Sequence, residues 1–208
     1  NIPIEPRESK QATEEVNVEE VEDELLEVSW EQVTNSIMSV DDNLPTLLLY
    51  HDDNWIEEFK SYNSNIQFCK QPINSSIEQL THQIKEYKNI KHFVWVSQHS
   101  TEQDDTILSF FSLFKAFTQL GFDQEDIHIS VITVCGQNIG CEKMISPNNA
   151  SVDGLACVLA KEMPNWNVRI YDIEDMYRIP IEEILCRTAE TGGKINVYRN
   201  SAWYSQKL

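Results

Sequence analysis

Glycine is absent from the first 120 residues of this chain. The six glycines are Gly121, Gly136, Gly140, Gly154, Gly192 and Gly193. A nucleotide-binding turn between a strand and a helix needs glycines, because backbone N–H groups must approach the phosphates closely. The first 120 residues therefore supply no turn of this kind.

Positive charge and long apolar runs are also scarce. The 16 Lys and Arg residues stand against 34 Asp and Glu, which gives a formal net charge of −18 and argues against a nucleic-acid partner. No apolar run reaches the roughly 18 residues that a membrane span requires, and no signal peptide opens the chain. The five cysteines form no CxxC pair, and their odd number is typical of reduced thiols in a cytoplasmic protein without a metal site.

The length of 208 residues allows one domain and a tail. Residues 1–28 hold ten acidic and two basic residues, so we predict an acidic flexible linker there. Val21, Leu25 and Val28 have helical spacing, and a short partner-binding helix is the alternative. We assign residues 29–208 to the folded domain. Because the first residue is Asn1 and not Met, we expect a fragment or a processed chain.

Short apolar runs alternate with amphipathic stretches from residue 46 onward. The pattern predicts strands at 46–50, 66–69, 92–96, 127–134, 168–171, 194–199 and 202–204. It predicts helices at 54–62, 75–87, from about 103 to 120, 152–162 and 181–189. This alternation favours a truncated, Rossmann-like, doubly wound α/β domain, with a mostly parallel sheet, helices on both faces and a C-terminal hairpin.

Two details of the predicted helices can be checked against a structure. Residues 75–78 and 100–103 both have the form of a capping box, which marks a helix start. The helix that ends before Gly121 places one set of apolar residues on a single predicted face. These residues are Ile107, Phe110, Phe111, Phe114, Phe117 and Leu120.

Ligands of doubly wound sheets bind beyond the carboxyl ends of the strands, so those ends hold the candidate site residues. Asp52 and Asp53 follow the first predicted strand, where two carboxylates would repel a phosphate. Asp172 follows the fifth and has the chemistry to bind a ribose, but no phosphate loop accompanies it. Cys135 and His99 supply a nucleophile and a base, but nothing in the sequence fixes their geometry.

A reductase signature, Tyr-x-x-x-Lys, occurs once, at Tyr87 and Lys91. It lies at a predicted helix end, on the side away from the ligand crevice, so we reject it as a catalytic pair. We therefore predict no catalytic, cofactor-binding or metal-binding residue in this chain.

A family resemblance rests on the C-terminal third. Residues 146–164 read SPNNASVDGLACVLAKEMP, followed by a strand ending at Asp172 and a Tyr-Arg hairpin at 196–204. Together with Trp30 after the acidic segment, this pattern resembles the ketoreductases of bacterial modular polyketide synthases, across residues 29–208 and most clearly over 127–208. Asn200 and Ser201 stand where the family often has Gly, and Trp203 where it often has a basic residue.

The resemblance implies the structural subdomain of such a ketoreductase. In that family a truncated first half without a cofactor site supports a second half, which binds NADPH and carries the catalytic residues. The chain stops at Leu208, about where the second half would begin, so no catalytic residue is carried over. The implied partner is the adjacent catalytic subdomain or a methyltransferase, and indirectly the acyl carrier protein. The Asn- and Ile-rich composition is similar to assembly lines with separate, trans-acting acyltransferases.

We expect contact with the neighbouring subdomain through four residues of the hairpin, Tyr198, Arg199, Trp203 and Tyr204. Aromatic and Arg side chains are frequent anchors of such contacts. The alternative is that these side chains only cover the sheet of this domain. Two other functions stay open: an independent α/β enzyme with a site around Cys135, Gly136 and Asp172, or an acidic interaction module that acts through residues 1–28.

Overall fold

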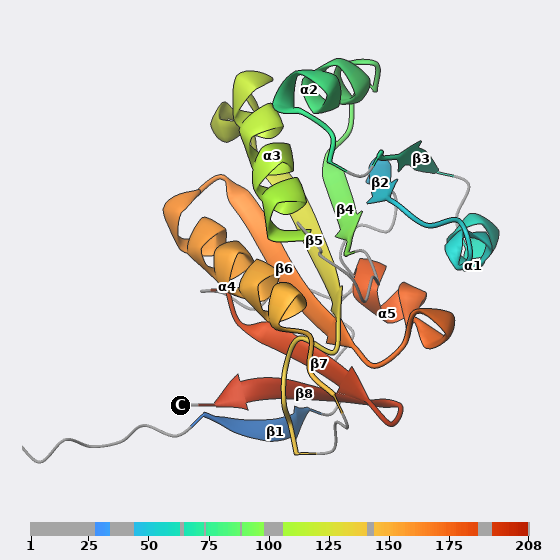
Figure 1. The fold of residues 1–208 in the computed structure, drawn as a ribbon, viewed down its shortest axis with the longest axis vertical. Coiled ribbons are helices and arrows are strands. Elements are labelled where there is room, and N and C mark those ends of the chain that lie inside the picture. The colour runs from blue at the N-terminus through green and yellow to red at the C-terminus, as the bar shows by residue number, and fades with distance from the viewer. Residues whose placement is uncertain are drawn as a thin grey trace, which may run out of the picture.

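The computed structural model describes residues 28–33, 44–62, 65–72, 74–87, 89–97, 106–140, 144–186 and 193–207. One sheet runs through this part of the chain, with its strands in the order β1-β8-β7-β6-β5-β4-β2-β3 (Figure 1). The strands are β1 (Ser29–Val33), β2 (Thr46–Tyr50), β3 (Ile66–Lys70), β4 (His92–Val96), β5 (Ile127–Val134), β6 (Trp166–Ile173), β7 (Ile195–Arg199) and β8 (Ala202–Lys207).

Helices cover both faces of the sheet. The helices are α1 (Ile56–Tyr62), α2 (Ile77–Lys85), α3 (Thr106–Gln119), α4 (Pro147–Glu162) and α5 (Ile181–Cys186), with short 3-10 turns η1 (Phe122–Gln124) and η2 (Met176–Arg178). Helices α2, α3 and α4 pack side by side on one face, while α1 and α5 contact each other on the opposite face.

Strands β2 to β7 are parallel, and β7-β8 and β8-β1 pair antiparallel. The mostly parallel, doubly wound sheet with a C-terminal hairpin is therefore confirmed. The first parallel strand, β2, lies between β3 and β4. The direction of winding reverses between β2 and β4, and this reversal is the place where open α/β sheets form a ligand crevice.

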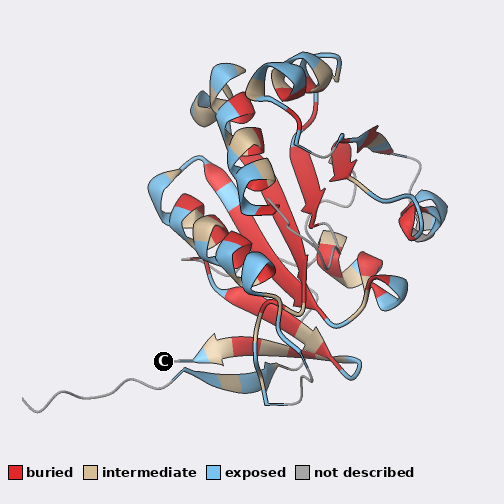
Figure 2. Ribbon diagram, in the orientation of Figure 1, coloured by how far each residue is buried: buried red, intermediate tan, exposed pale blue. Residues whose placement is uncertain are grey.

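The central strands are buried on both faces, which is why their sequences are nearly continuous aliphatic runs (Figure 2). In β2, Leu47 and Leu49 enter the core beneath α2, α3 and α4. Leu48 and Tyr50 enter the second core, beneath α1 and α5. The alternation along one strand thus builds two cores.

Strand β1 was not predicted from the sequence. We expected Trp30 only to open the domain, but it lies inside β1, opposite Gln206 of β8. Exposed Glu31 and Lys207 form an ion pair across the two strands, at 3.2 Å. The segment SWEQV has few apolar residues, and it is a strand because β8, far away in sequence, supplies its hydrogen-bonding partner.

Two predicted helix starts are shifted. The capping box of α2 is built on Ser76 and Gln79, one residue later than predicted, while Ser75 donates to the Pro72 carbonyl at 2.7 Å. Helix α4 begins at Pro147 and not at residue 152, because Ser146 caps it and Pro is favoured in the first helical turn. The second predicted capping box, at 100–103, lies outside the described residues.

The predicted apolar face of α3 is partly wrong. Ile107 and Phe111 are 36% and 41% exposed. The buried residues of α3 are Thr106, Phe110, Leu113, Ala116 and Phe117. Phe110 packs on Trp95 and Phe117 on Phe93, and these contacts decide which side of the helix faces the sheet.

Several other expectations fall on residues that the structure does not describe. They concern residues 1–27 of the predicted linker, His99, and the end of the fifth predicted helix at 187–189. Within the described ranges, no helix is both long enough and apolar enough to cross a bilayer.

Candidate functional site

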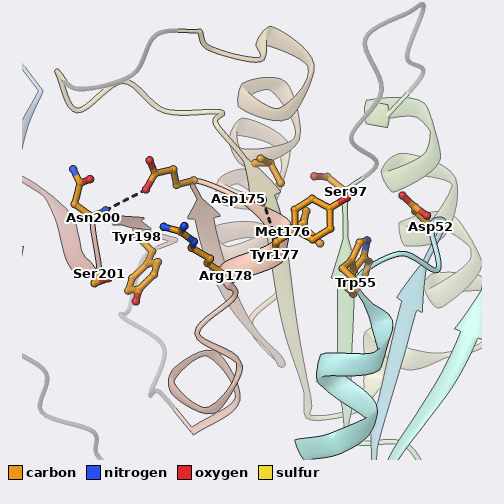
Figure 3. A pocket seen from close by; sticks show the side chains of 12 residues that line it. Asp52, Trp55, Ser97, Asp175, Met176, Tyr177, Arg178, Tyr198, Asn200 and Ser201 are labelled. Carbon is orange, nitrogen blue, oxygen red and sulfur yellow. Dashed lines mark hydrogen bonds between the residues drawn. The ribbon is translucent and has the colours of Figure 1, made fainter.

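A cavity of about 610 Å³ lies at the carboxyl edge of the sheet (Figure 3). Segments that follow β2, β4, β6 and β7 line it, together with the last residue of β5 and Tyr198 within β7. The lining residues are Asp52, Trp55, Ser97, Val134, Glu174, Asp175, Met176, Tyr177, Arg178, Tyr198, Asn200 and Ser201. The cavity thus occupies the position that the fold rule assigns to a ligand crevice.

The lining is acidic and contains no glycine among these residues. Asp52, Glu174 and Asp175 contribute three carboxylates, against the single guanidinium of Arg178. Phosphate binding needs backbone N–H groups or cationic side chains directed at the anion. The residues that line this cavity carry mostly negative charge, which would repel a phosphate.

A buried ion pair lies beside the cavity, between Asp172 at the end of β6 and Arg199 at the end of β7. Their side chains are 0% and 1% exposed. The Asp172 carboxylate accepts from the guanidinium and from the backbone N–H groups of Gly136 and Gln137, at 2.7 and 3.0 Å. Burial raises the pKa of Asp172, and these donors counter that rise.

A second buried carboxylate, Asp153 of α4, joins this cluster. It accepts from the Thr133 hydroxyl at 2.8 Å and from the Gln137 side-chain amide at 2.7 Å. Burial, and then the nearby charge of Asp172, raise the pKa of Asp153 to about 7. The cluster therefore ties the ends of β5, β6 and β7 to α4 through charge and hydrogen bonds.

Gly136 allows α4 to approach the loop that follows β5. A Cβ atom at this position would lie 2.7 Å from a carboxylate oxygen of Asp153 and 3.0 Å from the backbone nitrogen of Ala150. This glycine therefore serves close packing of the loop on the helix. Its N–H donates to Asp172, so that donor is already used inside the chain.

The sequence candidates fall into different environments. The Tyr87 hydroxyl donates to the Phe68 carbonyl at 3.1 Å, and burial raises the pKa of Tyr87 to about 12. Lys91 pairs with Glu125 at 3.1 Å. This arrangement is the opposite of the lowered tyrosine pKa that a reductase signature requires. The rejection of the pair stays a prediction.

Of the proposed enzyme site, the structure brings Cys135, Gly136 and Asp172 together. The Cys135 thiol donates to the Glu174 carbonyl at 3.3 Å, and Asp172 is fully buried. His99, the proposed base, lies outside the described residues. Within the described part of the chain, no three His, Cys, Asp or Glu residues gather closely enough to hold a metal ion.

The four predicted interface residues do not share one environment. Arg199 and Trp203 are 1% and 2% exposed, whereas Tyr198 and Tyr204 are half-buried. The Trp203 indole N–H donates to the Glu183 carboxylate, and its ring packs on Tyr171. Arg199 and Trp203 thus fit the alternative, that they cover the sheet of this domain. The interface role stays a prediction, which now depends on the two tyrosines.

Sequence reasoning missed Trp55, Ser97 and the segment 174–178 as cavity residues. Only the structure shows that the loops after β4 and β6 reach the same space. One signal was present for the buried cluster. Asp153 lies beside the apolar residues Val152, Ala156 and Leu159 on the buried face of α4, where Asn149 is the other buried polar residue. A carboxylate at such a position requires internal partners.

Two curated proteins of Bacillus subtilis (strain 168) are similar to this chain in sequence. Polyketide synthase PksM is 31% identical over 138 residues, which is 64% of this chain. Polyketide synthase PksN is 28% identical over 201 residues, which is 88% of this chain. The chain spans only 3% and 4% of the length of these two proteins. No family model matches it.

Solved ketoreductases share the fold at low sequence identity. The first ketoreductase of the tylosin polyketide synthase has a TM-score of 0.64 at 16% identity, covering 87% of this chain and 40% of that structure. A C2-type ketoreductase from a modular polyketide synthase has a TM-score of 0.65 at 14% identity, covering 86% and 42%. This chain is homologous to a segment of the Bacillus polyketide synthases and has the Rossmann-like fold of modular polyketide synthase ketoreductases.

Proposed function

We propose that this chain is a non-catalytic structural subdomain of a polyketide synthase, and that it supports an adjacent catalytic ketoreductase subdomain. The observation that carries the proposal is the connection between β2 and α1, at the reversal of the sheet. A dinucleotide would need a glycine-rich turn there. Residues 51–55 contain no glycine and two aspartates.

The geometry of this connection supports the same conclusion. The Asp52 carboxylate accepts from the backbone N–H of Asn54 at 3.1 Å and from its side-chain amide at 2.9 Å. A phosphate would need that N–H, and it would meet the carboxylate charge instead. The neighbouring Asp53 pairs with Lys70, so this cation is engaged as well.

The ribose-binding role considered for Asp172 is also disfavoured. Its carboxylate is 0% exposed and is engaged by Arg199, Gly136 and Gln137. A ribose hydroxyl would have to displace these donors from a buried charge, which is costly. We therefore assign NADPH binding to the catalytic subdomain and no cofactor to this chain.

In this proposal the partner is the adjacent catalytic subdomain, or alternatively a methyltransferase, of the same cytoplasmic synthase. Contact through half-buried Tyr198 and Tyr204 is part of the proposal. The acyl carrier protein would meet the catalytic half and reach this chain only indirectly. A synthase with trans-acting acyltransferases is consistent with the compositional resemblance.

The experiment compares the ketoreductase region of the synthase with and without residues 29–208. We expect the catalytic subdomain alone to lose solubility and NADPH-dependent reduction of a 3-ketoacyl thioester, and the separately produced chain to restore both in part. Deletion of residues 1–27 alone is the matched control, and it should preserve reduction. Full solubility and activity of the catalytic subdomain without residues 29–208 would contradict the proposal.

A further inference from the structure

We infer that the cavity at the carboxyl edge binds an aliphatic ammonium or guanidinium group. The inference goes beyond the structural role proposed above, since it gives the crevice a ligand class of its own. The volume of about 610 Å³ falls within the range of about 300–1,000 Å³ that is usual for small-ligand sites.

The negative charge of the residues that line the cavity favours a cation as the ligand. Asp52 lines the cavity from the segment after β2, and Asp175 from the segment after β6 (Figure 3). Glu174, next to Asp175, is also a lining residue. Each already accepts a hydrogen bond from within the chain: Asp52 from Asn54, Glu174 from the Asn200 N–H at 3.2 Å, and Asp175 from the Tyr177 N–H at 2.9 Å. These bonds fix the positions of carboxylates whose residues line the cavity.

The spacing of these carboxylates selects an organic cation over a metal ion. Within the described residues, no three acidic, His or Cys side chains converge on one point. A divalent cation needs several oxygen ligands at about 2.0–2.6 Å from a single centre. Carboxylates distributed around a cavity suit a longer ligand, with hydrogen-bond donors or charge at more than one position.

Aromatic side chains supply further surface for such a ligand. Trp55, Tyr177 and Tyr198 line the cavity, and Trp55 is only 6% exposed. Its ring is held edge-on by Tyr50 and Phe59, with ring centroids 6.1 and 5.6 Å away. Indole and phenol faces attract ammonium and guanidinium groups, and a fixed ring loses little freedom when it binds one.

Ser97 gives an independent indication of a ligand. It lines the cavity directly after β4 and is 3% exposed, yet its hydroxyl has no hydrogen-bond partner within the described part of the chain. Buried hydroxyls are normally paired. An N–H group of a ligand in the cavity would supply the missing donor.

The test is a calorimetric titration with agmatine, which carries a guanidinium at one end and an ammonium at the other. Glutarate, a shorter flexible chain with carboxylates at both ends, is the control ligand. We expect saturable agmatine binding below about 10 mM and none for glutarate. No saturable agmatine binding, or equal binding of glutarate, would overturn the inference.

Paired variants separate a site from general attraction to an acidic protein. We expect the double variant Asp52→Asn, Glu174→Gln to bind agmatine about tenfold more weakly. The amide oxygens can still accept the Asn54 backbone N–H bond at position 52 and the Asn200 N–H bond at position 174, while the bond from the Asn54 side-chain amide is lost. That last bond lies on the surface, so the fold should persist, and circular dichroism checks this. The control variant Glu57→Gln, Glu162→Gln removes the same charge outside the cavity lining. Equal weakening in both double variants would overturn the inference.

The ammonium or guanidinium group has two possible sources, a free amine or a basic side chain of a neighbouring domain. Agmatine titration of the longer synthase polypeptide distinguishes them. Binding as tight as to the chain alone indicates a free ligand, and loss of binding indicates that a neighbouring side chain fills the cavity. The reduction assay is independent of this titration, so the failure of one proposal leaves the other standing.

Discussion

Arg199 brings a positive charge into the interior at the end of β7, where its guanidinium meets the Asp172 carboxylate. It also donates to the Asp172 carbonyl at 2.9 Å and to the Gln137 carbonyl at 3.3 Å. Buried pairs of this kind are sensitive to the loss of one partner, because the other charge is then left in a low dielectric. The residue is therefore structural in this chain, whatever it contacts in a larger assembly.

The substitution Arg199→Met tests this structural role in the isolated chain. We expect it to lower the free energy of unfolding by about 3–5 kcal/mol, because Asp172 loses its compensating charge. Lys207→Met, which breaks the exposed pair with Glu31, is the matched control and should cost less than about 1 kcal/mol. Urea unfolding measures both. A similar, small loss of unfolding free energy in the two variants would show that Arg199 does not form the buried ion pair with Asp172.

Asp153 gives a prediction about pH. Its pKa is about 7 in the folded chain, against a usual value of 3.8, so the folded state keeps a proton that the unfolded state has released. The free energy of unfolding therefore falls as pH rises between these two values. Relative to Asp153→Asn, the unmodified chain should lose up to about 1.4 kcal/mol per pH unit over this interval. Urea unfolding at several pH values measures the difference, and a difference independent of pH would contradict the prediction.

The predicted interface residues could not be judged from the sequence alone, because the sequence does not show in which direction a side chain points. Arg199 and Trp203 have the residue types of interface anchors. In the observed register of β7 and β8, however, both side chains are buried within the domain. A sequence without its strand register does not say which side of a hairpin a residue occupies. The absence of a glycine-rich turn, in contrast, was readable at once, because it depends on composition alone.

At the scale of elements, the start of the connection from β5 to α4 packs closely on the helix. Gly136 lies against the first turn of α4, whereas Gly154, inside α4, has no neighbouring atom within 4 Å of the place that a Cβ would occupy. The two glycines thus have opposite roles. One permits a close approach, and the other only weakens a helix.

This contrast predicts opposite effects for two alanine substitutions. Gly136→Ala should destabilise the chain by about 1–3 kcal/mol, because the added carbon meets the backbone of α4 as well as Asp153. Gly154→Ala should stabilise it by about 0.5–1 kcal/mol, since alanine is the better helix former. Thermal unfolding of both variants checks this pair. Stabilisation by Gly136→Ala would contradict the described packing.

Elements were predictable where local sequence decides them. The aliphatic runs of β2, β4 and β5 indicate buried strands, and the helices between them follow from spacing and caps. Strand β1 depends on β8, which is distant in the sequence. The buried face of α3 depends on Trp95 and Phe93 of the sheet. Whether β1 forms and which face of α3 is buried are decided by tertiary contacts, and a local sequence pattern does not contain these contacts.

At the scale of the whole molecule, the chain combines a nucleotide-binding topology with an acidic crevice. The winding reverses between β2 and β4, and the cavity extends along the carboxyl edge from this reversal to β7. Its lining carries three carboxylates and one guanidinium, and the connection after β2 lacks the glycines that phosphates need. We therefore expect a retained fold whose cofactor chemistry resides elsewhere in the synthase.

Calorimetric titration of the 208-residue chain with NADPH tests this account most directly. Because the phosphates would face carboxylates and no glycine-rich turn, we predict no saturable binding up to about 1 mM cofactor. The catalytic ketoreductase subdomain that we propose as the partner, titrated in parallel, is the positive control. Saturable NADPH binding by this chain alone would contradict the account.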